Sequence, residues 1–78
     1  MRQVLCLIRR NPARNMARFY RLEIAADLFG GVTLTRNWGR IGTSGQQRRQ
    51  WFARIDEAVA ECTLWADRKQ RRGYARDA

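Results

Sequence analysis

The chain has 78 residues, of which 45% are hydrophobic, and its 16 cationic and 7 acidic side chains give a net charge of +9. This length suits one small domain, and the hydrophobic fraction excludes an intrinsically disordered chain. Because no apolar run approaches the roughly 20 residues of a membrane span and no signal peptide is recognisable, we expect a single domain over residues 1–78, located in the cytoplasm.

The first half of the chain predicts strands joined by a loop. Residues 4–8 form a short apolar run, which favours a strand. Pro12 lacks a backbone donor and lies between Asn11 and Asn15, so this segment is predicted to be a loop. Apolar residues alternate with polar ones over residues 19–29, which is typical of a half-buried strand in an antiparallel sheet.

A hairpin is predicted next. Gly30 and Gly31 suit a two-residue turn, because glycine adopts positive φ at both positions. Residues 32–35 resume the alternation with β-branched side chains. Residues 19–38 therefore form a hairpin with Trp38 at its open end. The hairpin brings Asn15, Arg18 and Phe19 toward Trp38.

One feature of this hairpin conflicts with its pattern. Arg36 and Trp38 fall on the same face as Val32 and Leu34, which should face the core. A buried, unpaired arginine would cost several kcal/mol, so the core must end, or a bulge must intervene, near position 36. Such conflicts tend to mark functional sites. The alternative is a tryptophan at the rim of the core, covered by Arg36.

The segment that follows combines an aromatic ring, a guanidinium group and three glycines. Residues 37–46 read Asn-Trp-Gly-Arg-Ile-Gly-Thr-Ser-Gly-Gln. Trp38 supplies a flat face and Arg40 supplies hydrogen-bond donors, while the glycines let the backbone turn tightly or approach a ligand. Residues 42–45 lack the Gly-Lys-Ser/Thr of a nucleotide-binding loop, so we interpret them as a turn that contacts one phosphate.

The last third of the chain predicts a strand and a helix. Residues 47–52 form a weakly patterned strand, and apolar residues then recur at three- and four-residue spacing up to Gly73, which ends the helix. The predicted fold class is α+β, a small antiparallel β-sheet of about four strands with one C-terminal α-helix packed on one face. The residues with helical spacing are Ile55, Ala58, Val59, Cys62, Trp65 and Lys69.

The excess positive charge is confined to the first two thirds of the chain. Residues 1–54 hold eleven arginines against two acids, whereas residues 55–78 hold five cations and five acids. The neutral helix is therefore a poor recognition helix for a major groove. Arginine binds phosphate through two parallel hydrogen bonds, so the composition indicates a nucleic-acid partner, compatible with a location at the nucleoid. The alternative is a codon bias toward arginine.

Residue types for catalysis and metal binding are scarce. The chain has no histidine, the commonest general base and metal ligand. Cys6 and Cys62 are too few and too far apart for a zinc site, and we interpret both as reduced core residues. Asp56, Glu57 and Glu61 are typical of a solvated helix face. We therefore expect no enzyme activity, cofactor, metal, small-molecule substrate or membrane partner.

Three segments resemble the WGR domain family. Residues 15–20 resemble its Asn-x-x-Lys-Phe-Tyr strand entry, and residues 37–46 resemble its x-Trp-Gly-Arg-(Val/Ile)-Gly-x-x-Gly-Gln segment. Residues 71–74 resemble the basic-Gly-Tyr ending of stand-alone bacterial members. The resemblance extends over roughly residues 11–76, and the three segments follow the order and spacing of the family, which makes it far more specific than the tripeptide alone. The resemblance implies an antiparallel sheet with one helix.

The resemblance also implies a function. In DNA-dependent poly(ADP-ribose) polymerases the WGR domain contacts DNA at a strand break. Trp38 would pack on the sugar of a terminal nucleotide, and Arg40 would bind DNA or couple the break to neighbouring domains, with Asn15 and Arg18 as accessory contacts. Two departures limit the transfer: Ala17 stands where several polymerases have a polar residue, and we expect no attached catalytic, zinc-finger or regulatory domain. The candidate nucleic-acid-binding residues are Asn15, Arg18, Arg36, Trp38, Gly39, Arg40, Gln46 and Tyr74.

Two functions are therefore open. The first is a non-catalytic module that binds DNA ends, nicks or 5′-phosphates through stacking by Trp38 and arginine contacts to phosphate. The second is a protein-interaction adaptor that uses the Trp38 and Arg40 surface, because tryptophan and arginine are enriched at interface hot spots. An open sheet edge would also permit a homo-oligomer.

Overall fold

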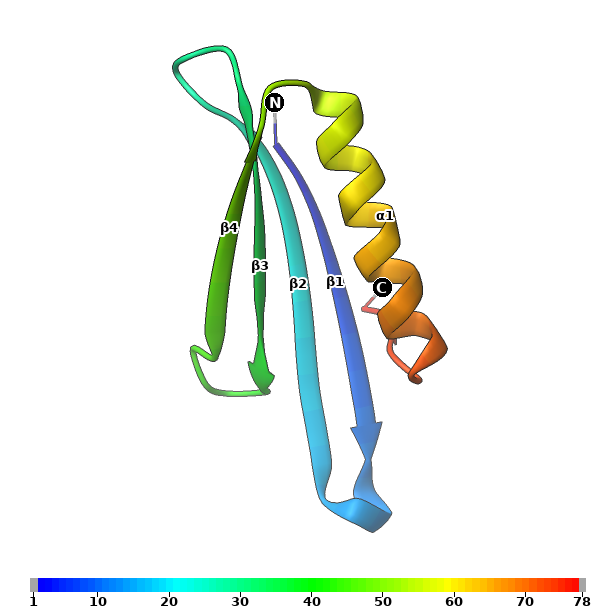
Figure 1. Ribbon diagram of the computed structural model, residues 1–78. Coiled ribbons are helices and arrows are strands. Elements are labelled where there is room, and N and C mark those ends of the chain that lie inside the picture. Colours follow the sequence, from blue (N-terminus) through cyan, green and yellow to red (C-terminus); the bar gives the residue numbers. More distant parts are fainter. Residues whose placement is uncertain (1, 78) are drawn as a thin grey trace.

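The computed structural model describes residues 2–77 and contains a five-stranded antiparallel sheet with one helix on one face (Figure 1). The strands lie in the order β4-β3-β2-β1-β5. The predicted α+β class, with its C-terminal helix, is confirmed, with one strand more than predicted. The elements are β1 (Arg2–Asn11), the 3-10 helix η1 (Pro12–Arg14), β2 (Met16–Ala26), β3 (Val32–Arg40), β4 (Gln46–Phe52), α1 (Ile55–Arg71) and β5 (Ala75–Arg76).

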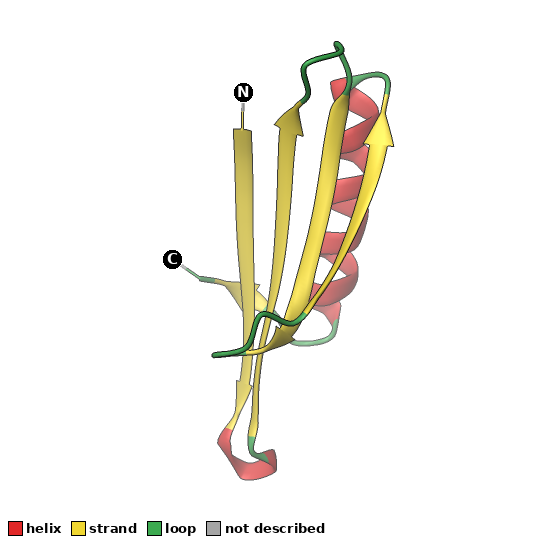
Figure 2. Ribbon diagram, turned by 90° about the vertical axis from the view of Figure 1, so that its left-hand side faces the viewer, coloured by secondary structure: helices red, strands yellow, loops and turns green. Residues whose placement is uncertain are grey.

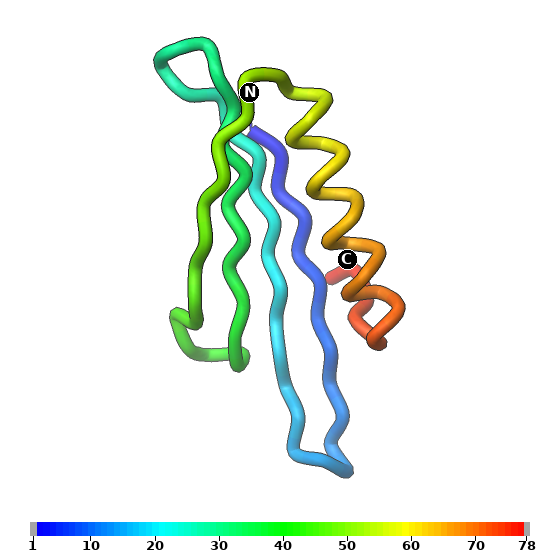
Figure 3. Tube along the Cα trace, in the orientation of Figure 1, coloured from blue at the N-terminus to red at the C-terminus, as the bar shows by residue number. Residues whose placement is uncertain are grey.

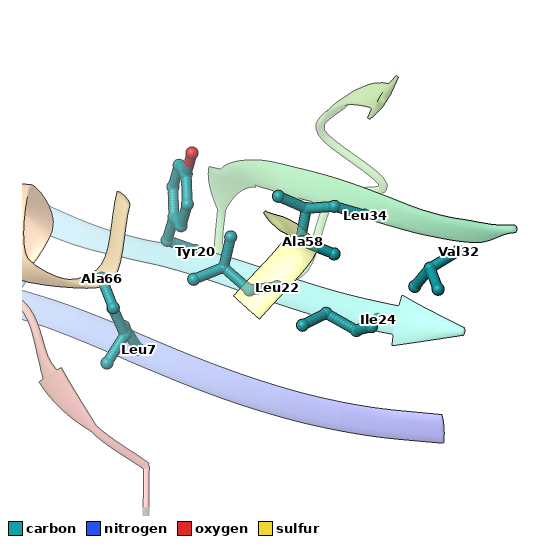
Figure 4. Packing of buried hydrophobic residues seen from close by; sticks show 8 residues of the cluster. All are labelled: Leu7, Tyr20, Leu22, Ile24, Val32, Leu34, Ala58 and Ala66. Atoms are coloured by element: carbon teal, nitrogen blue, oxygen red, sulfur yellow. The ribbon is translucent and has the colours of Figure 1, made fainter. Parts of the chain in front are cut away.

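The core lies between the sheet and α1 (Figure 4). Alternating side chains of β1, β2 and β3 point toward the helix, as the predicted period of two requires. The helix contributes two alanines, whose small side chains let its backbone approach the sheet closely. The buried cluster consists of Leu7, Tyr20, Leu22, Ile24, Val32, Leu34, Ala58 and Ala66.

The tail after α1 forms the additional strand. Gly73 adopts a φ of +97°, which turns the chain at the end of the helix. Ala75–Arg76 then pairs with Leu7 and Ile8 of β1. Two paired residues are too few to show an alternating pattern, so the sequence carried no signal for this strand. Its pairing fixes Tyr74 against the edge of the core.

The β2–β3 connection is longer than the predicted two-residue turn. β2 ends at Ala26 rather than Phe29, and residues 27–31 form a loop. Of the two glycines only Gly30 has a positive φ, +87°, whereas a type I′ turn needs two such residues. The alternation stops early as a result, and Leu28, which was predicted on the core face, is 97% exposed.

Asp27 organises this loop through its carboxylate. It accepts hydrogen bonds from the backbone N–H groups of Phe29 (2.8 Å) and Gly31 (2.9 Å). The indole Nε1 of Trp51 donates a third hydrogen bond at 2.8 Å. These donors, with the Phe29 N–H contributing most, hold the pKa of Asp27 below its usual value. The charged carboxylate therefore stabilises the folded state.

An Asp27→Asn variant tests this contribution. Because the folded pKa is depressed, the stability from Asp27 is complete above the usual pKa of 3.8 and is lost as the pH falls through the folded pKa. We expect the variant to unfold at a lower temperature than the wild type at neutral pH, and the two midpoints to converge in acid. Thermal unfolding followed by circular dichroism measures the gap. A gap of constant size at every pH would contradict this role.

The two cysteines lie on opposite faces of the sheet. Cys62 packs against the core, as predicted, and burial raises the pKa of its thiol. Cys6 lies opposite Arg21 on the face without the helix and is half-buried. The core prediction for Cys6 is therefore wrong, because the alternation along β1 directs Leu5 and Leu7 toward the helix instead.

The helix covers only part of the sheet. In Figure 2 it lies on one side, and the other face of the sheet is open. The β1–β2 hairpin extends beyond the C-terminal end of α1, and the β3–β4 loop lies toward the same end of the molecule (Figure 3). The β1–β2 hairpin, the β3–β4 loop and the C-terminal end of α1 thus lie toward the same end of the molecule, although they are distant in sequence. No helix within residues 2–77 has the length and apolar character that a membrane crossing requires.

Candidate nucleic-acid interface

Three arginines lie side by side across three strands at this end of the sheet. Arg9 of β1 is directly opposite Arg18 of β2, and Arg18 is directly opposite Arg40 of β3. By alternation they share the helix-bearing face with Tyr20 and Trp38. Like charges in directly opposed positions are destabilising, and within the described residues none of the three forms a salt bridge. An anion bound to this arginine row would relieve the repulsion.

Lys69 joins the arginine row from the last turns of α1. Its ammonium nitrogen lies 4.7 Å from the centre of the Tyr20 ring. Burial, and then repulsion from nearby arginines, hold the pKa of Lys69 below its usual value. The charge of this lysine is therefore disfavoured by its surroundings, and a bound phosphate would favour it. The repelling arginines are Arg72, Arg36 and Arg18.

Arg18, Arg40 and Lys69 line an open hollow of about 480 Å³, which we call the end hollow. It combines three cations with two aromatic side chains and contains no acid, so it offers phosphate contacts beside a flat apolar surface. The part of the chain that the structure describes has no cluster of three acids or cysteines that could hold a metal ion. The lining residues are Arg18, Trp38, Gly39, Arg40, Lys69 and Tyr74.

The end hollow unites five of the residues predicted from the sequence and adds Lys69, which was missed. A signal for Lys69 existed, because helical spacing placed this one lysine of the chain on the apolar side of the helix. A long side chain at such a position buries its stem and keeps its charged end near solvent. Its meeting with Arg18 and Arg40 depends on where the helix ends over the sheet.

Trp38 lies at the rim of the core. It is half-buried, packs against the core cluster and stacks on Tyr20, with ring centres 6.0 Å apart and planes at 23°. The pairing of β2 and β3 continues through this region in register, with Arg36 opposite Leu22, so no bulge intervenes. Instead the fully buried positions of β3 end at Leu34. The alternative of a tryptophan at the rim of the core therefore describes its surroundings better, although one side of Trp38 still lines the end hollow.

Arg36 is held by aromatic residues rather than by an acid. Its guanidinium carbon lies 3.9 Å from the centre of the Trp65 ring and 5.8 Å from that of Trp38. Its Nη1 donates a hydrogen bond of 3.4 Å to the Tyr20 hydroxyl, whose pKa is raised by burial. These contacts explain how an arginine is accommodated on the core face. Arg36 does not line the end hollow.

The glycine-rich loop after β3 is tightly closed. A Cβ atom on Gly39 would lie 2.8 Å from the Cα of Gly45, so a larger residue would push the loop apart. The Asn37 side-chain amide donates to the carbonyl oxygens of Ser44 (3.0 Å) and Gln46 (2.7 Å). Gln46 thus supports the loop through its backbone, while its side chain is exposed beside Trp38 in the β3–β4 register. The loop is a compact support for the end of β3.

The strand-entry segment reaches this loop, as the hairpin predicted. The Arg40 guanidinium Nη1 donates to the carbonyl oxygen of Asn15 at 3.2 Å, and the Ile41 N–H donates to the carbonyl oxygen of Ala17 at 2.9 Å. Asn15 has a φ of +50°, a left-handed conformation that asparagine tolerates better than most residues. Its side chain is exposed at the margin of the end hollow, and its carbonyl orients Arg40.

Comparisons with known proteins agree with this geometry. The family model of the WGR domain matches residues 3–78. The uncharacterised protein y4dW of Sinorhizobium fredii (strain NBRC 101917 / NGR234) is 44% identical over 66 residues, which are 85% of this chain and 32% of that protein. The chain therefore spans about a third of the length of the curated relative that it matches. No solved structure matches the chain.

Proposed function

The chain belongs to the WGR domain family, whose members in poly(ADP-ribose) polymerases bind nucleic acid. From this premise we propose that the chain is a non-catalytic module that binds DNA at ends, nicks and 5′-phosphates. Residues 1–78 act as one domain in this proposal. The observation that carries it is the arginine row, Arg9, Arg18 and Arg40, which faces Lys69 without an acidic partner among the described residues.

The arginine row supplies the affinity. Each cation that contacts a phosphate releases a condensed counterion from the DNA, which favours binding at low salt. Arg18, Arg40 and Lys69 meet in one hollow, so a single phosphate group can contact more than one of them. The repulsion among these cations in the free protein is relieved when the anion binds. This term acts on any DNA backbone and provides no preference for a break.

Trp38 supplies the preference for a terminus. Its ring is backed by Tyr20 and packed on the core, so it presents a fixed surface beside Arg40. An intact duplex does not offer the exposed terminal nucleotide that such a surface contacts, whereas an end or nick does. An aromatic contact of this kind is worth roughly 1–3 kcal/mol, equivalent to about a ten- to a hundredfold preference. Tyr74 and Gly39 complete the hollow, and Asn15 and Gln46 flank it.

A binding comparison tests the proposal against the protein-adaptor alternative. Closed circular DNA, the same circle with one nick, and a blunt 5′-phosphorylated linear DNA are titrated at two salt concentrations. We expect the nicked and linear forms to bind more tightly than the closed circle, with affinities that fall steeply with salt. Equal binding of all three forms excludes recognition of breaks. A shallow salt response, together with a protein recovered on the Trp38 and Arg40 surface, would favour the adaptor.

A further inference from the structure

A second hollow lies between α1 and the outer strand of the sheet. It has a volume of about 560 Å³ and shares one residue, Trp38, with the end hollow. Three of its lining residues are arginines and one is an acid. We call it the β4 hollow. Its lining residues are Arg36, Trp38, Arg48, Arg49, Gln50, Glu61 and Trp65.

The β4 hollow repeats the electrostatic arrangement of the end hollow. Arg36 of β3 is directly opposite Arg48 of β4, so two like charges again occupy a cross-strand pair on the helix-bearing face. Within residues 2–77 neither forms a salt bridge. The acid of the hollow, Glu61, accepts a hydrogen bond from the Trp65 indole at 2.8 Å instead. The hollow therefore has the charge of an anion site.

Arg36 is prepared for a ligand in this hollow. Stacking at 3.9 Å on Trp65 and the hydrogen bond to the Tyr20 hydroxyl hold its planar group in one orientation. Little side-chain entropy is lost when such a group binds phosphate, because the guanidinium group is already ordered. Arg48 and Arg49 are exposed on the edge strand β4 and line the hollow, with Arg48 on the same face of the sheet as Arg36.

We infer that the β4 hollow binds an unpaired strand that continues past the terminus held at Trp38, so that the preferred DNA end carries a single-stranded overhang. This inference rests on the proposed function. If Trp38 packs on the terminal nucleotide of the duplex, a strand that passes it has left the last base pair. The hollow also lies within the range of volumes, about 300–1,000 Å³, that hold one small ligand, which suits single nucleotides rather than a duplex. Contacts to phosphate make the overhang preference independent of sequence.

Three DNAs with the same duplex test the inference: one blunt, one with a short 3′ overhang and one with a short 5′ overhang. We expect one overhang to bind the wild type about tenfold more tightly than the blunt duplex. For this overhang, a plot of log affinity against log salt concentration should also have a slope that is steeper by about 1.4. Two phosphate contacts on a single strand contribute roughly 0.7 each to this slope. The double variant Arg48→Gln, Arg49→Gln should lose this gain and keep the affinity of the wild type for blunt DNA.

A charge-matched control is available at the opposite end of the sheet. Arg2→Gln with Arg54→Gln removes the same charge from two exposed arginines that lie outside both hollows, and should keep the overhang gain. An overhang gain that survives in the Arg48 and Arg49 variant, or that is absent from the wild type, overturns the inference. If linear DNA still binds better than closed circles in either case, the proposed function stands. If linear and circular DNA bind equally, both the proposed function and this inference are wrong.

Discussion

Replacing Trp38 with alanine should abolish the preference for broken DNA and leave most of the affinity for closed circles. Under the proposed function, the ring of the wild type would add roughly 1–3 kcal/mol of contact at a terminus, and this contact would be absent on an intact duplex. The affinity ratio of nicked to closed DNA should therefore fall from about ten- to a hundredfold to nearly one. The arginine row is untouched by the substitution and keeps its salt-dependent attraction to both forms.

The packing of Trp38 requires a second variant. Because the ring stacks on Tyr20 and borders the core, alanine also leaves a void, and a domain of this size has a stability of only a few kcal/mol. Trp38→Leu keeps an apolar side chain against Tyr20 and removes the flat ring, so it should remain folded and still lose the preference. Trp51→Leu changes an exposed tryptophan on the open face, and this variant should retain the preference for broken DNA. Equal losses in the Trp38 and Trp51 variants would contradict the role of Trp38.

The double variant Arg18→Gln, Arg40→Gln should lose DNA affinity without losing stability. Charge-assisted hydrogen bonds are worth about 1.5–3 kcal/mol each, so two lost phosphate contacts weaken binding by at least about a hundredfold. The log–log salt slope should decrease by about 1.8, since each phosphate contact on a duplex contributes roughly 0.9. In the free protein the same change removes two of three mutually repelling charges. The unfolding midpoint should therefore stay constant or rise.

This combination separates a binding role from a structural one. If the arginine row mainly supported the fold, the variant would unfold at a lower temperature, and its weaker binding would follow from lost structure. The pair Arg2→Gln, Arg54→Gln again provides the control, because it removes equal charge far from the end hollow. An unchanged salt slope in the Arg18 and Arg40 variant would place the phosphate contacts elsewhere on the molecule.

Most of the fold followed from patterns that span many residues. Alternation over residues 19–29 predicted the inward face of Tyr20, Leu22 and Ile24, and helical spacing predicted the face of α1. Local features that depart from these long patterns could not be predicted from the sequence. The loop at residues 27–31 depends on three hydrogen bonds to one carboxylate, and β5 consists of two residues whose partner strand lies far away in the sequence.

The candidate site was only partly predictable for the same reason. The hairpin register predicted that Arg18 and Asn15 would approach the loop that contains Arg40, and both do. Arg9 was missed because its place in the row requires β1 to extend to Asn11, beyond the apolar run that marked the strand. The surroundings of Trp38 were undecided, since alternation placed it on the core face and only the structure shows where the buried positions of β3 end.

We propose, above all, that this fold binds DNA where the strand is broken. The most direct test of this proposal is the ratio of the affinities of the wild-type protein for a circle with one nick and for the same circle closed, measured by competition at one salt concentration. The two DNAs have the same length and sequence, and when the closed circle is relaxed they differ only at the break and its terminal phosphate. We expect the nicked circle to compete about ten- to a hundredfold better per break. A ratio of one would contradict the claim and leave only general attraction to the DNA backbone.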